Sequence, residues 1–175
     1  MSQATSSSAA LPIAHVALRI LIILNWVGGA AILALLVVSP NREWIMSAFQ
    51  LTPSPDADRV ILGLRAVAAL GLVVIALNFV ILKRLLAMVE TVRQGDPFVA
   101  ANASRLETIA RTLLALQVIS IIIAAIGKTV SSPAHPVNLD AGFSINGWLA
   151  VLLMFVLARV FAYGTRLRDD LEGTV

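Results

Sequence analysis

The most regular feature of this sequence is a set of four long apolar segments separated by shorter, more polar connections. The segments cover residues 16–38, 60–82, 106–127 and 145–164. A bilayer core about 30 Å thick is crossed by about 20 helical residues, which is close to the length of each segment. Charged side chains are few within them, with Arg65 in the second and Arg159 in the fourth. The pattern predicts an all-α membrane protein, a bundle of four transmembrane helices.

The first and third connections carry helix-breaking residues. Residues 39–57 contain three prolines and therefore cannot form one continuous helix. Within them, residues 42–51 place Trp44 and other apolar side chains at helical spacing, which predicts a short helix at the membrane interface. Residues 128–144 contain Pro133, Pro136 and Gly142 and are expected to be irregular. The two connections either form a small cap or lie as simple connectors on the headgroups.

The second connection predicts a helical turn. The apolar helical pattern of the second segment continues to Val92 and is followed by Gly95, Asp96 and Pro97. Glycine suits the position after a helix, aspartate the N-cap of the next helix and proline its first turn. We therefore expect a helical hairpin at residues 83–105. The last segment also continues without a helix breaker until Gly173, which gives a helical, acidic tail at residues 166–175.

Composition supports the membrane class. The chain is 59% hydrophobic and 13% charged, with a mean hydropathy of +0.91, whereas soluble domains are about 45–50% apolar and 25% charged. The absence of cysteine excludes disulfides and thiolate nucleophiles, and two histidines argue against a metal centre. The sequence contains neither a phosphate-binding loop nor a hydrolase motif. We therefore expect no enzyme activity, no cofactor and no metal. We also expect no direct nucleic-acid binding, because the basic residues are dispersed along the chain.

The distribution of lysine and arginine predicts the orientation. If both termini are cytoplasmic, nine basic residues lie on the cytoplasmic side and four on the other, as the positive-inside rule requires. The hairpin is then cytoplasmic, and a bacterial inner membrane fits best. The first segment is longer than the apolar region of a signal peptide, so we expect it to be retained. Residues 1–12 are predicted to be a disordered tail and residues 13–175 a single four-span domain.

Polar side chains inside the spans form a second candidate site. Asn25, Asn78, Gln117 and Arg159 all fall in the inner half of their spans under this topology. Such groups seek one another in hydrocarbon, so a shared polar layer is expected, either as contacts between helices or as a site for a small ligand or lipid headgroup. Glycines in the spans, such as the pair at residues 28–29, are expected to permit close helix packing.

Two segments carry a resemblance to a known family. The first is residues 95–98 (GDPF) followed by residues 102–106 (NASRL) and 109–110 (IA). The second is residues 157–161 (LARVF) with Gly164 and the ending 167–175 (LRDDLEGTV). Together they resemble the bacterial domain-of-unknown-function family 2975. Its members are small four-span membrane proteins, commonly encoded beside a small helix-turn-helix regulator of the Cro/repressor type.

The resemblance implies a regulatory membrane protein that binds this cytoplasmic regulator. The hairpin and the tail are the predicted binding surface, through Gly95, Asp96, Pro97, Phe98, Asn102, Arg105, Arg168, Asp169, Asp170 and Glu172. The three acidic tail residues also suit a solvated helix end paired with its own arginines, such as Arg168 with Glu172. The alternative function is a small channel, transporter or lipid-binding bundle centred on the polar layer. A homodimer is compatible with either function.

Overall fold

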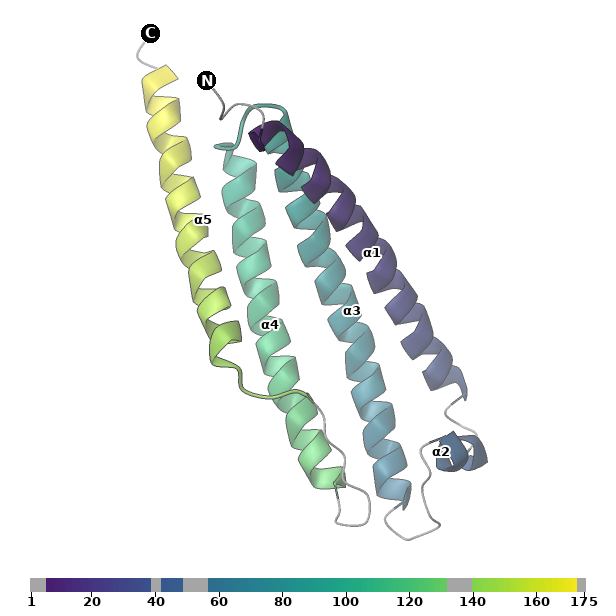
Figure 1. The fold of residues 1–175 in the computed structure, drawn as a ribbon. Helices are drawn as coiled ribbons and strands as arrows, with labels where there is room; N and C mark the ends of the chain where they lie inside the picture. The colour runs from purple at the N-terminus through teal and green to yellow at the C-terminus, as the bar shows by residue number, and fades with distance from the viewer. Residues whose placement is uncertain (1–5, 39–41, 49–56, 132–139, 173–175) are drawn as a thin grey trace. The chain divides into compact units, whose positions relative to one another are not determined.

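A computed structural model describes residues 6–38, 42–48, 57–131 and 140–172 of the chain (Figure 1). Four of its helices are long and apolar enough to cross a membrane, and no described residue lies in a strand. The prediction of an all-α protein with four helices able to span a membrane is therefore confirmed. The helices are α1 (Ser6–Val38), α2 (Arg42–Ala48), α3 (Ala57–Arg93), α4 (Ala100–Val130) and α5 (Ile145–Glu172).

The long helices extend beyond the apolar segments, as the helical pattern predicted. Helix α3 continues to Arg93 and α5 to Glu172. Helix α2 forms within the expected range of 42–51, of which residues 49–51 lie outside the described residues. Helix α1 begins at Ser6, so residues 6–12 of the expected disordered tail are helical in the structure. Alanine and leucine in that stretch are strong helix formers, which accounts for the earlier start.

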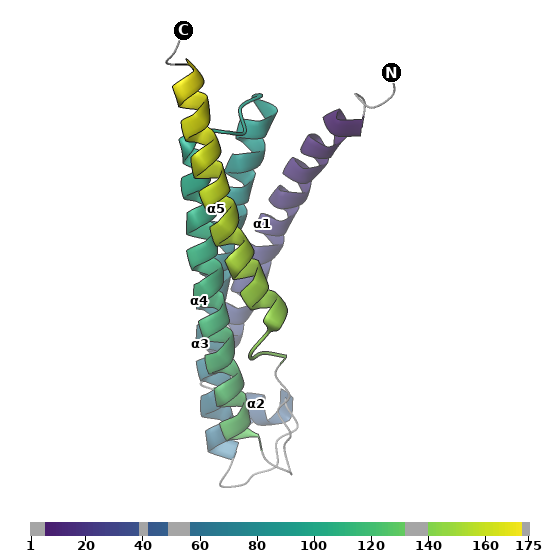
Figure 2. The ribbon, with the colours of Figure 1, turned by 90° about the vertical axis from the view of Figure 1, so that its left-hand side faces the viewer.

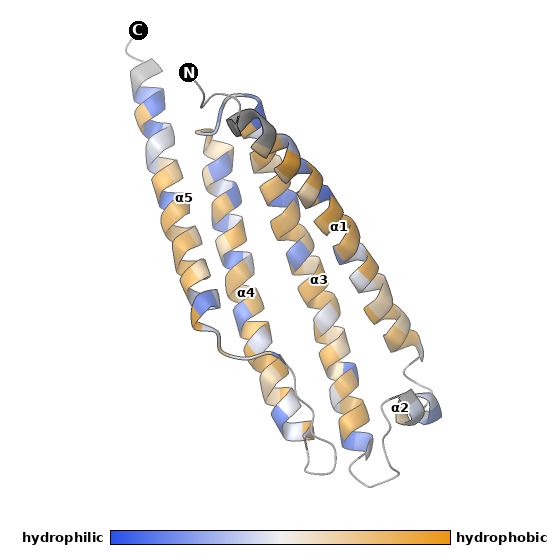
Figure 3. Cartoon of the chain, viewed as in Figure 1, coloured by the Kyte–Doolittle hydropathy of each residue, from blue (hydrophilic) through white to orange (hydrophobic). Residues whose placement is uncertain are grey.

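Apolar residues dominate the middle of the long helices (Figure 3), and many of them are exposed. On α1, Leu24 and Val27 are 57% and 60% exposed, and most other exposed side chains of this helix are also large hydrophobic ones. In water each such side chain would forgo about 25 cal/mol for every Å² left unburied. Lipid tails remove this penalty because they are as apolar as the side chains. The surface is therefore the one expected of helices that face hydrocarbon.

The chain divides into two compact units. Unit 1 comprises Met1–Asn25, Leu77–Leu114 and Ile145–Val175, and unit 2 comprises Trp26–Ala76 and Ala115–Ser144. Helices α1, α3 and α4 contribute residues to both units, whereas α2 belongs to unit 2 and α5 to unit 1.

The core of unit 1 is formed by the first half of α4 and by α5. Leu106, Ile109 and Ala110 of α4 are almost fully buried, at the i, i+3 and i+4 spacing of one helix face. The buried hydroxyls of Thr112 and Thr165 donate to carbonyl oxygens one turn earlier in their own helices, at 2.8 and 2.9 Å. These two hydroxyls are thus satisfied within their own helices, without a partner helix.

Unit 2 is held together by close packing of α1 against α3. A Cβ atom on Gly29 would lie 2.9 Å from Cγ2 of Ile75, and one on Gly71 would lie 3.3 Å from Cδ1 of Ile32. Only a residue without a side chain fits the first of these positions without a shift of its neighbour. The expectation that glycines in the spans permit close helix packing is confirmed here.

Candidate functional site at the helical turn

The turn between α3 and α4 closes α3 with a glycine in the left-handed conformation. Gly95 has φ of 88°, and its N–H donates to the carbonyl of Val92 at 3.1 Å. The N–H of Asp96 donates to the carbonyl of Thr91, also at 3.1 Å. These two bonds make a Schellman motif, which satisfies carbonyls at the end of the helix. The predicted role of Gly95 is therefore confirmed.

The predicted start of α4 was wrong. Asp96 was expected as its N-cap and Pro97 in its first turn, but the helix begins at Ala100. The carbonyl of Val99 accepts the N–H of Asn102 at 2.8 Å, which places the N-cap at Val99. The physical reason is that Asp96 still belongs to the end of α3 through its N–H, so the chain needs three further residues before the next helix.

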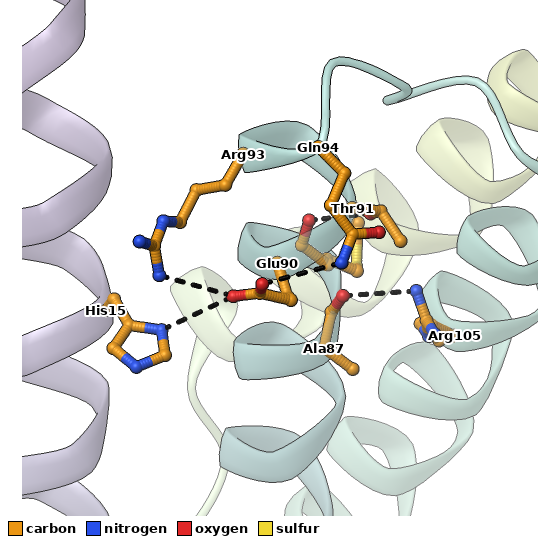
Figure 4. A network of polar contacts seen from close by, with 8 residues as sticks. His15, Ala87, Glu90, Thr91, Arg93, Gln94 and Arg105 are labelled. Atoms are coloured by element: carbon orange, nitrogen blue, oxygen red, sulfur yellow. Dashed lines mark hydrogen bonds and ion pairs between the residues drawn. The ribbon is translucent and has the colours of Figure 1, made fainter.

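Asn102 is the centre of a buried network that ties α3, the turn and α4 together. Its side chain is fully buried, and Nδ2 donates to Oγ1 of Thr91 and to the carbonyl of Pro97, both at 2.8 Å. Its Oδ1 accepts from Nη1 of Arg105 at 2.7 Å. The same Nη1 lies 3.2 Å from the carbonyl of Ala87 on α3 (Figure 4). Both predicted site residues in α4, Asn102 and Arg105, thus hold the hairpin in shape.

The turn contacts the C-terminal half of α5. The rings of Phe98 and Phe161 have centroids 5.3 Å apart, at an interplanar angle of 31°. A Cβ atom on Gly164 would lie 3.1 Å from Cδ1 of Phe98, so the glycine lets the ring approach the helix. The carboxylate of Asp96 forms an ion pair with Arg168. Figures 1 and 2 both show the turn beside α5.

These contacts join the two predicted binding segments into one surface. We call it the turn-and-tail surface and define it as residues 95–98 together with Phe161, Gly164 and residues 166–170. Phe98 is 44% exposed, and Asp169 and Asp170 are also exposed. The side chain of Glu172, with which Arg168 was expected to pair, lies outside the described side chains.

Sequence reasoning missed Phe161 and Gly164 as part of this site. A signal was present in their spacing, because residues 161, 164 and 168 fall at i, i+3 and i+7 on one helix face. That face contacts Phe98 and Asp96 of the turn, which lie two positions apart in the chain.

A second polar cluster in unit 1 links α1 to α3 through Glu90 (Figure 4). Its carboxylate accepts hydrogen bonds from Arg93 at 3.3 Å and from Gln94 at 3.5 Å. Nδ1 of His15 lies 3.9 Å from the same carboxylate, so this histidine has the acidic neighbour that the sequence did not reveal. Within the described part of the chain, no group of three or more histidine, cysteine, aspartate or glutamate residues is arranged to hold a metal ion.

The four predicted intramembrane polar residues divide between the units. Asn25, Asn78 and Arg159 belong to unit 1 and Gln117 to unit 2. Asn25 and Asn78 are half-buried, whereas Arg159 is exposed and does not line the interior of its unit. Glu107, the acidic residue considered as a partner for Arg159, pairs with Arg111 at 2.5 Å instead. The structure therefore gives no support to a polar layer that includes Arg159.

Comparison with known proteins yields one match. No curated protein and no protein of solved structure matches the chain. The sequence pattern of the family DUF2975, described as proteins of unknown function, matches residues 50–175. The matched region contains the whole turn-and-tail surface and excludes α1 and α2. The chain thus belongs to the DUF2975 family, as its two motifs indicated.

Proposed function

We propose that this chain is a membrane regulatory protein whose turn-and-tail surface binds a cytoplasmic helix-turn-helix regulator. The observation that carries the proposal is the contact between the two family motifs. Asp96 and Arg168 lie 72 residues apart in the chain and pair with each other, beside the contact of Phe98 with Phe161. The role is one of binding rather than catalysis.

The chemistry of the surface suits a basic protein partner. Protein interfaces combine aromatic anchors with a polar rim, and the turn-and-tail surface includes exposed Phe98 and Leu167 as well as the exposed residues Asp169 and Asp170. DNA-binding proteins carry clustered lysine and arginine that contact phosphates. A regulator held by these carboxylates would have part of its basic surface covered, and its release would restore DNA binding.

The proposal requires the turn and the tail to be cytoplasmic, in the orientation that the basic residues favour. Alkaline-phosphatase fusions test this, because the enzyme is active only outside the cytoplasm of a bacterium. Fusions within residues 39–57 or 128–144 are expected to be active, and fusions after residue 95 or 175 inactive. Activity after residue 95 would place both motifs on the outer side and end the proposal.

Binding is tested by co-purification of the full-length chain with the regulator that the resemblance predicts beside its gene. Replacing Asp169 and Asp170 together by asparagine is expected to reduce recovery of the regulator at low salt, and the difference from the parent protein is expected to shrink at higher salt, because salt screens exposed charges. Asp140→Asn is the matched control, because Asp140 is also exposed but belongs to the connection between α4 and α5. Equal recovery with all variants, and with residues 168–175 deleted, would exclude the tail as the binding site.

A further inference from the structure

Unit 2 contains an apolar groove that the proposed function does not use. Its volume is about 410 Å³, within the roughly 300–1,000 Å³ typical of small-molecule sites. Ile32 of α1, Trp44 of α2 and Ile123 of α4 line it, together with a stretch of α3 that runs from Leu64 to Ile75. The lining is almost wholly apolar.

The groove runs along α3. Leu64 and Ile75 are eleven residues apart on this helix, which corresponds to about 16 Å along its axis. An elongated groove with an apolar lining suits the hydrocarbon chain of a lipid.

One end of the groove differs from the other in charge. Ile32, Gly71 and Ile75 line the end at which α1 and α3 pack closely. Arg65 lies at the opposite end of the α3 stretch, and it is the one charged side chain among the described lining residues. A guanidinium offers a planar set of donors that matches a carboxylate. An arginine within a transmembrane segment is also a common counter-ion for a bound anionic group.

We propose that this groove binds a long-chain fatty acid, with the acyl chain along α3 and the carboxylate at Arg65. The length and the apolar lining suit an acyl chain, and the guanidinium selects an anionic headgroup at one end. This inference is independent of the turn-and-tail surface, because every lining residue belongs to unit 2.

Trp44 supplies a built-in probe for the test. The full-length protein with Trp26 and Trp148 replaced by phenylalanine has Trp44 as its single tryptophan, because the chain contains three. In nanodiscs of phosphatidylcholine, dibrominated stearic acid is expected to quench its fluorescence at a concentration about tenfold lower than its methyl ester does. The factor is the loss expected for one charge-assisted hydrogen bond.

Two matched pairs of variants locate the ligand. Arg65→Gln is expected to abolish the difference between acid and ester, whereas Arg59→Gln, an exposed position on the same helix, retains it. Ala68→Phe fills the groove and lowers quenching by the acid, whereas Ala69→Phe alters the adjacent, exposed position and leaves quenching unchanged. If Arg65→Gln fails to fold, the alanine pair decides the question alone.

Three results would overturn the proposal. The first is equal quenching of Trp44 by the acid and the ester in the parent protein. The second is quenching by the acid that survives Ala68→Phe in a folded protein. The third is equally strong quenching by dibrominated phosphatidylcholine, which would show that bulk bilayer lipid fills the groove.

Discussion

Replacing Asn102 by alanine is expected to open the hairpin turn. The substitution removes two hydrogen bonds of ordinary kind, to Thr91 and Pro97, and one from the charged guanidinium of Arg105. At about 1 kcal/mol for each neutral bond and about 1.5 kcal/mol for the charged one, the loss is about 3.5 kcal/mol. Because the amide is fully buried, water does not replace it without structural rearrangement.

Amide hydrogen exchange across residues 88–104 measures this loss directly. A change of about 3.5 kcal/mol in the free energy of local opening corresponds to exchange roughly 300-fold faster. Ser104→Ala is the control, since this serine is exposed and lies on the same turn of α4. Exchange in Asn102→Ala that matches the control would refute the reasoning and would mean that the network contributes little to the hairpin.

Three further predictions concern the same surface. Gly95→Val is expected to cost about 1–2 kcal/mol in denaturant unfolding because of the positive φ alone, since no atom lies within 4 Å of the added Cβ; a cost equal to that of Gln94→Val would contradict this. Gly164→Leu should displace the ring of Phe98 and lose about 0.5–1.5 kcal/mol of aromatic contact in thermal unfolding. Gly164→Ala should leave the stability nearly unchanged in the same measurement, because the higher helix propensity of alanine offsets the tight fit against Phe98. A double-mutant cycle on Asp96 and Arg168 should give a coupling of about 0.2–1 kcal/mol that falls with salt, because both side chains are over one-third exposed; a salt-independent coupling would argue against a simple ion pair.

Helical periodicity accounts for the features that sequence reasoning placed correctly. The apolar pattern runs through Val92, and no helix breaker follows residue 164 before Gly173; the structure continues α3 and α5 to match. The conformation of Gly95 was also predictable, because few other residues adopt a positive φ at a helix end. Such features depend on residues close together in the chain.

The features that were missed depend on tertiary contacts. Asp96 suits both an N-cap and an ion pair by residue type. Its N–H donates to the carbonyl of Thr91 at the end of α3, and its carboxylate pairs with Arg168, which lies 72 residues further along the chain. His15 likewise lies beside an acidic residue of another helix, Glu90, which is 75 residues further along the chain. The exposure of Arg159 depends on which face of α5 packs against its unit, and this face was not evident from an apolar helix with polar residues on several sides.

The range of sequence separations around the turn implies an order of assembly. The contacts of Asn102 with Pro97 and Thr91 span 5 and 11 residues, and that of Arg105 with Ala87 spans 18. The pairing of Asp96 with Arg168 spans 72. Because local contacts close with less loss of chain entropy, they form faster. We therefore expect the α3–α4 hairpin to fold first during synthesis and to serve as the template on which α5 docks last.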